Sequence, residues 1–300
     1  MLGNTLKSFV LSVCLILFSF NTHAIESIAK TALLIDLSTG EILLDKNSNE
    51  RTYPSSMTKI MTALMAFEKI KDGTLSMDQE FMVSNKAWQM GGSKMFIEVD
   101  KKVKVSDLLL GIVVQSGNDA SIAMAEGISG SEDTFAIDMN NLAKKIGLTG
   151  TNFVNSSGWP DDNHYTTAKD LAQIAEYTLV NHPELYEMYG ITEFTYSGIK
   201  QDNRNPLLYS FDGADGFKTG HTEAAGYGLV GSAERNGRRL LLVLNGLETS
   251  KARAQESLRL MDWGFNNFQL VDFYQEGEVV IEANTWLGEQ DKVKIITQND

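Results

Sequence analysis

A serine and a lysine three positions apart are the first residues in this 300-residue sequence that could perform nucleophilic chemistry. In Ser56-Met57-Thr58-Lys59, helical geometry would place the Ser56 hydroxyl and the Lys59 amine on one face. A serine hydroxyl needs a base to take its proton, and a lysine is that base only when neutral. Burial or a neighbouring cation must therefore lower the lysine pKa from about 10.4 toward neutrality. Taken alone, the pattern is more often a capping serine followed by a solvated lysine.

Two further clusters contain residues of a similar kind. Ser116-Gly117-Asn118 offers a hydroxyl and an amide that could relay a proton and orient an amine, although such residues also form ordinary turns. Lys218-Thr219-Gly220 places a cation, a hydroxyl and a glycine on a strand edge, where they could bind a carboxylate. The glycine allows a second backbone to approach closely. The structural alternative is an edge strand protected by a charge.

The elements that must position these clusters follow from the hydrophobic pattern. Apolar residues at helical spacing predict a helix over residues 55–71, beginning after Pro54. Further helices are predicted from Ser106 and at 120–126, 132–146, 168–179 and 255–265, and strands at 32–36, 41–44, 217–219, 226–234 and 239–244. Strands, a helical block, further strands and a final helix predict an α/β (α+β) fold with a largely antiparallel sheet. Its first and last segments should share that sheet.

Local signals support several of these boundaries. Asn236-Gly237 between the last two strands is a strong hairpin turn signal. Thr167 can cap the helix that follows it, with Asp170 three residues on as in a capping box, and Gly147 suits a helix C-terminus.

The first 24 residues are predicted to be a signal peptide. Lys7 precedes an apolar run over residues 9–20 that is too short to span a bilayer comfortably. Thr22 and Ala24 place small residues before a cleavage site, and a retained anchor is the alternative. The single cysteine, Cys14, lies inside the apolar run, so the mature chain would have none. Export to an oxidising compartment, the periplasm, is the prediction.

Composition limits the partners. The sequence is 43% hydrophobic and 22% charged, as in ordinary globular proteins, and its formal net charge is -13. Nucleic acid and a bare anionic membrane surface both favour a basic face, so neither is expected as the main partner.

Together and in this order, the three clusters resemble the S-x-x-K, S-x-N and K-T-G motifs of penicillin-recognising serine enzymes. In particular, the sequence resembles the low-molecular-mass penicillin-binding proteins of the D-alanyl-D-alanine carboxypeptidase type. The similarity includes residues 53–59, 92–96, 114–120, 215–222 and 225–246, and it covers roughly residues 25–266. It implies a fold of the β-lactamase/transpeptidase type.

The resemblance implies a role for each motif residue. Ser56 would attack the carbonyl between the two terminal D-alanines of a peptidoglycan stem pentapeptide and form an acyl-enzyme. Lys59 would take the serine proton, Ser116 would pass a proton toward the leaving amine, and Asn118 would position Lys59 and the substrate backbone. Water would then release the shortened peptide. β-Lactams would acylate Ser56 as substrate mimics, and no metal or cofactor is required.

Substrate binding is assigned by the same resemblance. Lys218 and Thr219 would hold the terminal carboxylate with help from Arg253, and Gly220 lies on the same strand. The backbone N–H groups of Ser56 and His221 would form the oxyanion hole.

Other ionisable residues carry weaker expectations. Lys218 near Lys59 would supply the like charge that lowers the pKa of that base. His221 could instead be a catalytic histidine, although Ser56 already has a nearer base. His164 and His182 are expected on the surface.

Three other activities use similar motifs. A D,D-endopeptidase would cut cross-links with the same residues. A class A-like β-lactamase needs a carboxylate for fast deacylation, and Glu176 is the best candidate, although Gly117 stands where such enzymes carry Asp. A penicillin-binding sensor would acylate without turning over, but such receptors normally follow transmembrane helices and none is predicted after residue 20.

Three segments are expected: a signal peptide over residues 1–24, a catalytic domain over 25–266, and the beginning of a β-rich C-terminal domain over 267–300. Residues 278–292 most clearly resemble the start of the family's second domain. Family members usually continue into an amphipathic helix on the inner membrane, whereas this sequence ends in Gln298-Asn299-Asp300. Either the sequence is partial or the anchor is absent, so inner-membrane attachment is expected only if a longer parent chain carries that helix.

Overall fold

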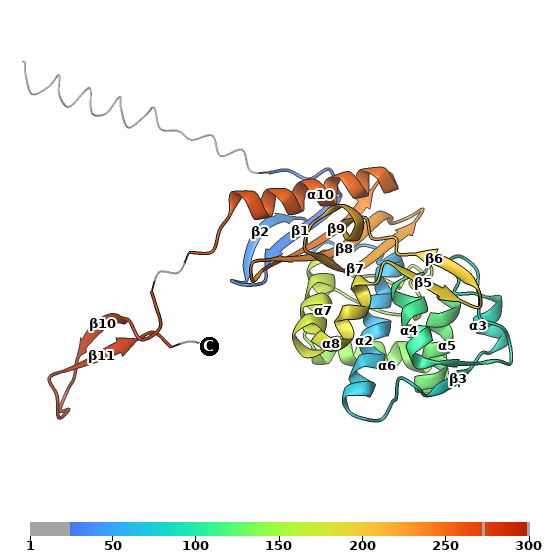
Figure 1. Ribbon diagram of the computed structural model, residues 1–300, viewed down its shortest axis with the longest axis horizontal. Coiled ribbons are helices and arrows are strands. Elements are labelled where there is room, and N and C mark those ends of the chain that lie inside the picture. Colours follow the sequence, from blue (N-terminus) through green and yellow to red (C-terminus); the bar gives the residue numbers. More distant parts are fainter. Residues whose placement is uncertain (1–24, 272–273, 299–300) are drawn as a thin grey trace, which may run out of the picture.

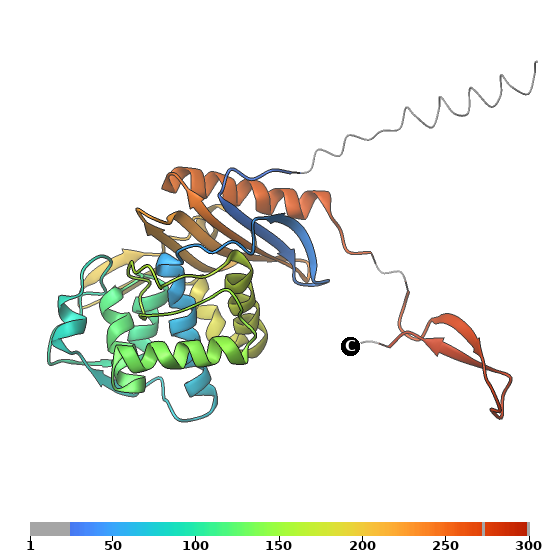
Figure 2. The ribbon, with the colours of Figure 1, turned by 180° about the vertical axis from the view of Figure 1, so that it is seen from behind.

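A five-stranded antiparallel sheet lies between one long helix and a block of helices (Figures 1 and 2). The computed structural model describes residues 25–271 and 274–298, so the predicted signal peptide lies outside the described residues. The strand order is β2-β1-β9-β8-β7, and β1 pairs with β9, so the two ends of the catalytic segment share one sheet as predicted. The sheet strands are β1 (Thr31–Asp36), β2 (Glu41–Lys46), β7 (Ala214–Thr222), β8 (Gly226–Arg235) and β9 (Arg238–Leu247).

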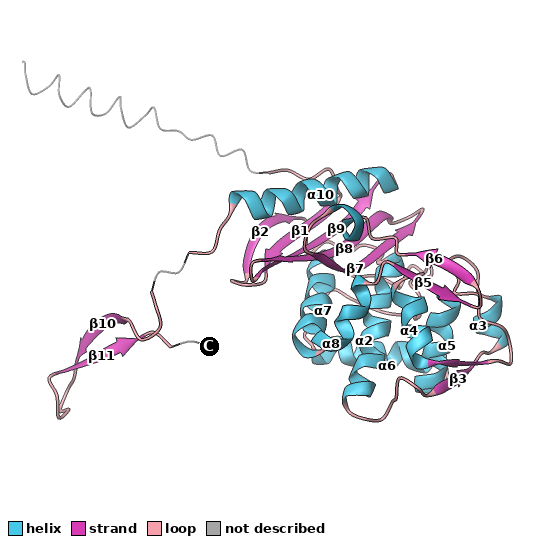
Figure 3. Ribbon diagram, in the orientation of Figure 1, coloured by secondary structure: helices cyan, strands magenta, loops and turns pink. Residues whose placement is uncertain are grey.

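Most of the other elements that precede residue 268 lie on the two faces of this sheet (Figure 3). α10 (Ser250–Asn267) covers one face. The helical block on the other face consists of η1 (Ser55–Thr58), α2 (Lys59–Lys71), α3 (Asn85–Gln89), α4 (Val105–Val113), α5 (Asn118–Ser129), α6 (Glu132–Lys145), α7 (Ala168–Asn181), α8 (Pro183–Tyr186) and η2 (Glu187–Gly190). The short helix α9 (Leu207–Ser210) precedes β7. Two small hairpins add β3 (Glu80–Met82) with β4 (Lys102–Lys104), and β5 (Glu193–Tyr196) with β6 (Ile199–Asp202). The predicted antiparallel α/β fold is confirmed.

Alternation along the strands creates two hydrophobic cores. Successive side chains of a strand point to opposite faces of the sheet. In β9, Leu241 and Val243 pack with the helical block, whereas Leu240, Leu242 and Leu244 pack with the side that α10 covers. The sheet therefore holds the helical block and the long C-terminal helix in one body.

Turn and cap residues fix several boundaries. Asn236 and Gly237 connect β8 to β9 with φ angles of 53° and 76°, the left-handed values that a two-residue type I′ turn requires. The Thr167 hydroxyl accepts a hydrogen bond from the Asp170 N–H at the start of α7, as predicted. The Asp170 carboxylate instead accepts from the backbone N–H of Gly150, which ties a loop to the helix.

The predicted helix over residues 55–71 has two parts. η1 is a 3-10 turn, and α2 begins at Lys59 and is buried as far as Phe67. Ser56 therefore lies on the tighter turn, directly before the central helix of the block.

The C-terminal strands β10 (Val279–Asn284) and β11 (Lys292–Ile296) pair with each other in a separate two-stranded sheet. Nearly all of their side chains are exposed. Among the residues described, no helix is both long enough and apolar enough to cross a membrane.

Candidate active site

The predicted nucleophile lies where η1 meets strand β7. Ser56 is half-buried at this junction. A Cβ added to Gly220 would lie 3.0 Å from the carbonyl oxygen of Pro54, so a larger residue would push β7 and η1 apart by a few tenths of an ångström. The hydroxyls of Ser55 and Thr222 lie 3.2 Å apart across the same contact. The S-x-x-K and K-T-G motifs are therefore adjacent in the fold.

Three acceptors surround the amine of Lys59. Its Nζ lies 3.2 Å from Ser56 Oγ, 2.7 Å from Asn118 Oδ1 and 2.6 Å from the backbone oxygen of Ser157. The Lys59 side chain is fully buried, so these contacts replace water. Two of the three predicted motifs thus meet at one amine.

The electrostatic surroundings make Lys59 a base near neutral pH. Burial, followed by the positive charge of Arg204, lowers the pKa of Lys59 to about 7, while Asp119 and Glu132 act in the opposite direction. A lysine with this pKa is about half neutral at pH 7. The like charge that lowers the pKa of Lys59 is that of Arg204, and the repulsion expected between Lys218 and Lys59 is present as a lowered pKa of Lys218. Burial and the charges of Lys59, Arg204 and Arg253 lower the pKa of Lys218 well below 10.5.

Four basic side chains lie close to one another in the site. Besides Lys59, these are Lys218, Arg204 and Arg253, and within the described part of the chain none of them pairs with a carboxylate. Burial lowers the pKa of Arg253 to about 10, and its Nε is buried without a hydrogen-bond partner. Arg204 donates to the Ser93 hydroxyl at 2.6 Å. Such a cluster, in a chain of net charge -13, would be stabilised by an anionic ligand.

The S-x-N motif is held by the N-terminus of α5. Ser116 is buried and has a φ of 61°, a backbone conformation that is uncommon for residues other than glycine and is frequent at functional sites. Asn118 donates through Nδ2 to the Gly91 carbonyl at 2.9 Å while its Oδ1 receives Lys59. The next residue, Asp119, accepts the backbone N–H groups of residues 95–97. This carboxylate fixes the loop that forms one wall of the site.

A cavity of about 300 Å³ opens over the serine. Its lining includes Ser56, Asn118 and His221, together with Ser157 and Trp159. Lys59, Ser116, Lys218 and Thr219 are buried, and Arg253 is 9% exposed. A larger cavity of about 660 Å³ contains none of the motif residues, so size alone does not identify the site. Glu176 lines that larger cavity, not the one at Ser56, and offers no support for a β-lactamase-like deacylation.

The histidines differ from expectation. His164 and His182 are 2% and 4% exposed, so their predicted surface positions were wrong. His164 accepts the Val154 N–H at Nδ1 and lies 2.8 Å from the Thr58 hydroxyl through Nε2, and burial lowers its pKa to about 4. His182 bonds to the Glu68 carboxylate at 2.8 Å. The His221 ring is exposed and stacks on Tyr227, with centroids 3.9 Å apart.

Sequence reasoning missed Arg204 and Ser157. Arg204 lies outside the three motifs, and nothing in its neighbourhood marks it as a cation of the site. Ser157 acts through its backbone oxygen, for which the side chain gives no signal. The only sequence signal for Ser157 is that it lies in Asn-Ser-Ser-Gly, a pattern typical of a turn.

A serine beside a buried lysine of lowered pKa, near basic side chains that form no ion pair with the described carboxylates, on this sheet-and-helix fold, defines a penicillin-recognising serine hydrolase. The sequence pattern of the D-alanyl-D-alanine carboxypeptidase family, Peptidase_S11, matches residues 19–249. The chain belongs to that family, as the motifs predicted.

Individual relatives agree with this assignment. The chain is 39% identical to D-alanyl-D-alanine carboxypeptidase DacA of Haemophilus influenzae over 272 residues, which are 89% of this chain and 69% of that protein. It is 38% identical to DacF of Bacillus subtilis, over 90% of this chain and 70% of the relative. Among solved structures, penicillin-binding protein 5 of H. influenzae superposes with a TM-score of 0.83 at 38% identity, over 90% of this chain and 80% of that one. Penicillin-binding protein D2 of Listeria monocytogenes, solved in the ampicillin-bound form, gives a TM-score of 0.74 at 30% identity, over 81% and 99%. The predicted family, fold and enzyme class are confirmed.

Proposed function

We propose that this protein is a serine D-alanyl-D-alanine carboxypeptidase that removes the terminal D-alanine from peptidoglycan stem pentapeptides through an acyl-enzyme on Ser56. The observation that carries the proposal is the environment of Lys59. A buried amine with a pKa of about 7, 3.2 Å from Ser56 Oγ, meets the requirements for a general base at neutral pH.

Acylation begins with proton transfer from Ser56 to Lys59. A neutral lysine amine has two N–H bonds and one lone pair. The Asn118 and Ser157 oxygens take the two N–H groups, at 2.7 and 2.6 Å, which leaves the lone pair for the Ser56 hydroxyl. As Oγ bonds to the substrate carbonyl carbon, the developing oxyanion accepts the backbone N–H groups of Ser56 and His221. The C–N bond then breaks, and D-alanine leaves with a proton passed from Lys59 through Ser116.

The cation group supplies the site for the substrate carboxylate. Lys218 and Thr219 on β7, together with Arg253, bind the terminal carboxylate, and Arg204 adds to the positive field. An anion here compensates the charges of Lys218, Arg204 and Arg253, which form no ion pair with any carboxylate in the described part of the chain. A C-terminal D-alanine therefore suits the site better than an amide or an internal peptide bond.

Deacylation uses water at the same base. Once D-alanine has left, a water molecule in its place donates a proton to Lys59 and attacks the acyl carbon. The bond from that carbon to Ser56 Oγ then breaks, and Lys59 returns the proton to Oγ, which restores Ser56 and frees the shortened peptide. A β-lactam has no leaving group that departs, so its acyl-enzyme keeps the water position blocked. β-Lactams are therefore expected to label Ser56, in line with the ampicillin-bound form of the Listeria protein.

The test compares wild type with Ser56→Ala on diacetyl-Lys-D-Ala-D-Ala, measuring free D-alanine over time and labelling by a fluorescent penicillin. Release and labelling by the wild type alone are expected. Labelling without release would move the assignment to an endopeptidase or a penicillin-binding sensor. A folded wild type that neither releases D-alanine nor takes up label would refute the proposal.

The proposal extends to location and domain organisation. The signal peptide of residues 1–24 directs export to the periplasm, residues 25–266 form the catalytic domain, and residues 267–300 begin a β-rich second domain. N-terminal sequencing of the exported protein checks the first part, with Ile25 as the expected first residue.

A further inference from the structure

We propose that Glu132 is a positioning residue for the catalytic base: it fixes the loop of residues 155–159, whose Ser157 carbonyl orients the Lys59 amine. This inference rests on the proposed function, since it assigns to the loop a part in acylation of Ser56. No motif includes Glu132, which lies 73 positions after Lys59 in the sequence and meets it only through the fold.

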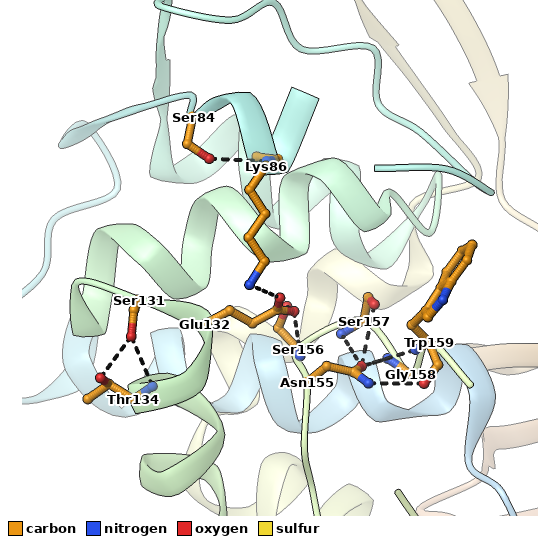
Figure 4. A network of polar contacts seen from close by, with 11 residues as sticks. Ser84, Lys86, Ser131, Glu132, Thr134, Asn155, Ser156, Ser157, Gly158 and Trp159 are labelled. Carbon is orange, nitrogen blue, oxygen red and sulfur yellow. Dashed lines mark hydrogen bonds and ion pairs between the residues drawn. The ribbon is translucent and has the colours of Figure 1, made fainter. Parts of the chain in front are cut away.

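The contacts of Glu132 point to the loop (Figure 4). Glu132 begins α6, and its side chain is only 8% exposed. Its Oε1 accepts the backbone N–H of Ser156 at 3.0 Å and the Ser156 hydroxyl at 2.7 Å. Its Oε2 lies 2.9 Å from the Nζ of Lys86 on α3. The carboxylate therefore connects two helices of the block to one residue of the loop.

A second side chain completes the hold on the loop. The Oδ1 of Asn155 accepts the backbone N–H groups of Ser157, Gly158 and Trp159, at 3.2, 2.8 and 3.0 Å. The four N–H groups of residues 156–159 are thus bound by two side-chain acceptors, Glu132 and Asn155. The backbone oxygens of residues 156 and 157 point away from these two acceptors.

Those two oxygens face helix α2. The Ser156 oxygen accepts from the Thr62 hydroxyl at 2.5 Å, and the Ser157 oxygen accepts from Lys59 at 2.6 Å. Lys59 and Thr62 are three residues apart and share a helix face. The loop therefore presents two successive acceptors to two successive donors, and a shift of Ser156 moves the acceptor of Lys59 with it.

The loop also has little room to move. A Cβ on Gly158 would lie 1.7 Å from the backbone oxygen of Ser55, so the loop packs directly against the residue before the nucleophile. Lys59 needs both N–H acceptors in place for its lone pair to point at Ser56. Misplacement of a reacting group by about 1 Å can cost on the order of 100-fold in rate.

Charge gives Glu132 a second influence on the base. Its carboxylate raises the pKa of Lys59, against burial and Arg204, which lower it. The positive charge of Lys86, whose side chain is 52% exposed, partly offsets the negative charge of this carboxylate. Loss of the charge should therefore leave more neutral Lys59 at low pH, whereas a purely structural residue would not move the pH profile.

The experiment measures the second-order rate constant for acylation of Ser56 by a fluorescent penicillin, from pH 5.5 to 9, with Tm for each variant. Glu132→Ala removes the acceptor of Ser156 and should lower the rate constant about 10- to 100-fold. Glu132→Gln keeps an acceptor oxygen and should stay within about threefold of wild type at pH 9, while its ratio of rates at pH 6 and pH 9 rises about twofold or more. Asp133→Asn, an exposed neighbour in the same helical turn, is the matched control and should retain both the rate and the profile.

The outcomes separate the two proposals. If the wild type is not acylated at Ser56, the proposed function fails before Glu132 is tested. If the wild type is acylated and folded Glu132→Ala reacts at the wild-type rate, the positioning role is overturned. Should Glu132→Ala fail to fold, Glu132→Gln decides, because a pH profile identical to that of wild type also overturns the role.

Discussion

Replacement of Arg204 by glutamine should make the enzyme more sensitive to acid. The charge of Arg204 is the second cause, after burial, of the lowered pKa of Lys59. Its removal lets that pKa rise, so protonated Lys59 persists to higher pH. The acid limb of the pH profile for Ser56 acylation should move upward accordingly.

The magnitude follows from the wild-type pKa. Lys59 falls from 10.5 to about 7, which corresponds to about 5 kcal/mol of preference for the neutral amine. At pH 7 about half of the molecules carry the free base, and at pH 6 roughly one tenth. A solvated lysine would be neutral in fewer than about one molecule in 1,000 at pH 7. Wild-type acylation should therefore be about tenfold slower at pH 6 than at pH 9, and acylation of Arg204→Gln should slow by more than this factor over the same interval.

The assay is the rate of penicillin labelling at each pH, divided by the rate of the same variant at pH 9. This division removes weaker binding of the β-lactam carboxylate, which Arg204→Gln also causes. Arg235→Gln serves as the control, because Arg235 lies 4.1 Å from the Phe211 ring on the α10 side of the sheet and should leave the profile unchanged. A limb that stays in place or moves to lower pH for Arg204→Gln contradicts the reasoning.

Three further predictions concern the same region. The pKa of Lys59 is about 7 in the folded chain and about 10.5 in the unfolded chain, so the unfolded chain binds more protons between these two pH values. The contribution of Lys59 to the free energy of unfolding therefore rises with pH across that window and is lost as the pH falls to 7. Lys59→Met should therefore flatten the free energy of unfolding between pH 7 and pH 10, measured by urea titration. The pKa of His164 is about 4 in the folded chain and 6.5 in the unfolded chain. Neutral His164 therefore contributes about 3 kcal/mol to the free energy of unfolding, and this contribution is lost as the pH falls from 6.5 to 4. His164→Gln should make the free energy of unfolding less sensitive to acid in the same urea titration. Gly220→Ala would place a Cβ 3.0 Å from the Pro54 oxygen and should destabilise the protein by about 1–3 kcal/mol and slow penicillin labelling; an unchanged Tm and labelling rate would show that β7 can move away from η1.

Much of the scaffold could be predicted because local signals and global packing agree. The apolar spacing in residues 57–67 indicates the helix α2, which is buried all round from Lys59 to Phe67, and Asn236-Gly237 alone defines the hairpin between the two longest strands. The 3-10 start of that helix was not predicted, since four residues do not distinguish a period of 3 from one of 3.6. The buried histidines were misjudged because burial of an imidazole depends on partners such as Glu68 and Thr58, which only tertiary structure brings near.

The active site likewise contains some groups that the sequence indicates and others that only the fold reveals. Side chains that belong to three short clusters in a fixed order, such as Ser56 with Lys59, are visible in the sequence, and the structure brings this pair together. The groups that make Lys59 a base are not visible, because they act through burial, through a backbone oxygen of Ser157, and through a guanidinium from a loop far along the chain. A motif can therefore name the proton acceptor while saying nothing about its pKa or the direction of its lone pair. Both depend on how the loop of residues 155–159 and Arg204 are held against α2. Substitutions in that loop or at Arg204, which no motif marks, should change the pH dependence of the reaction while the three motifs stay intact.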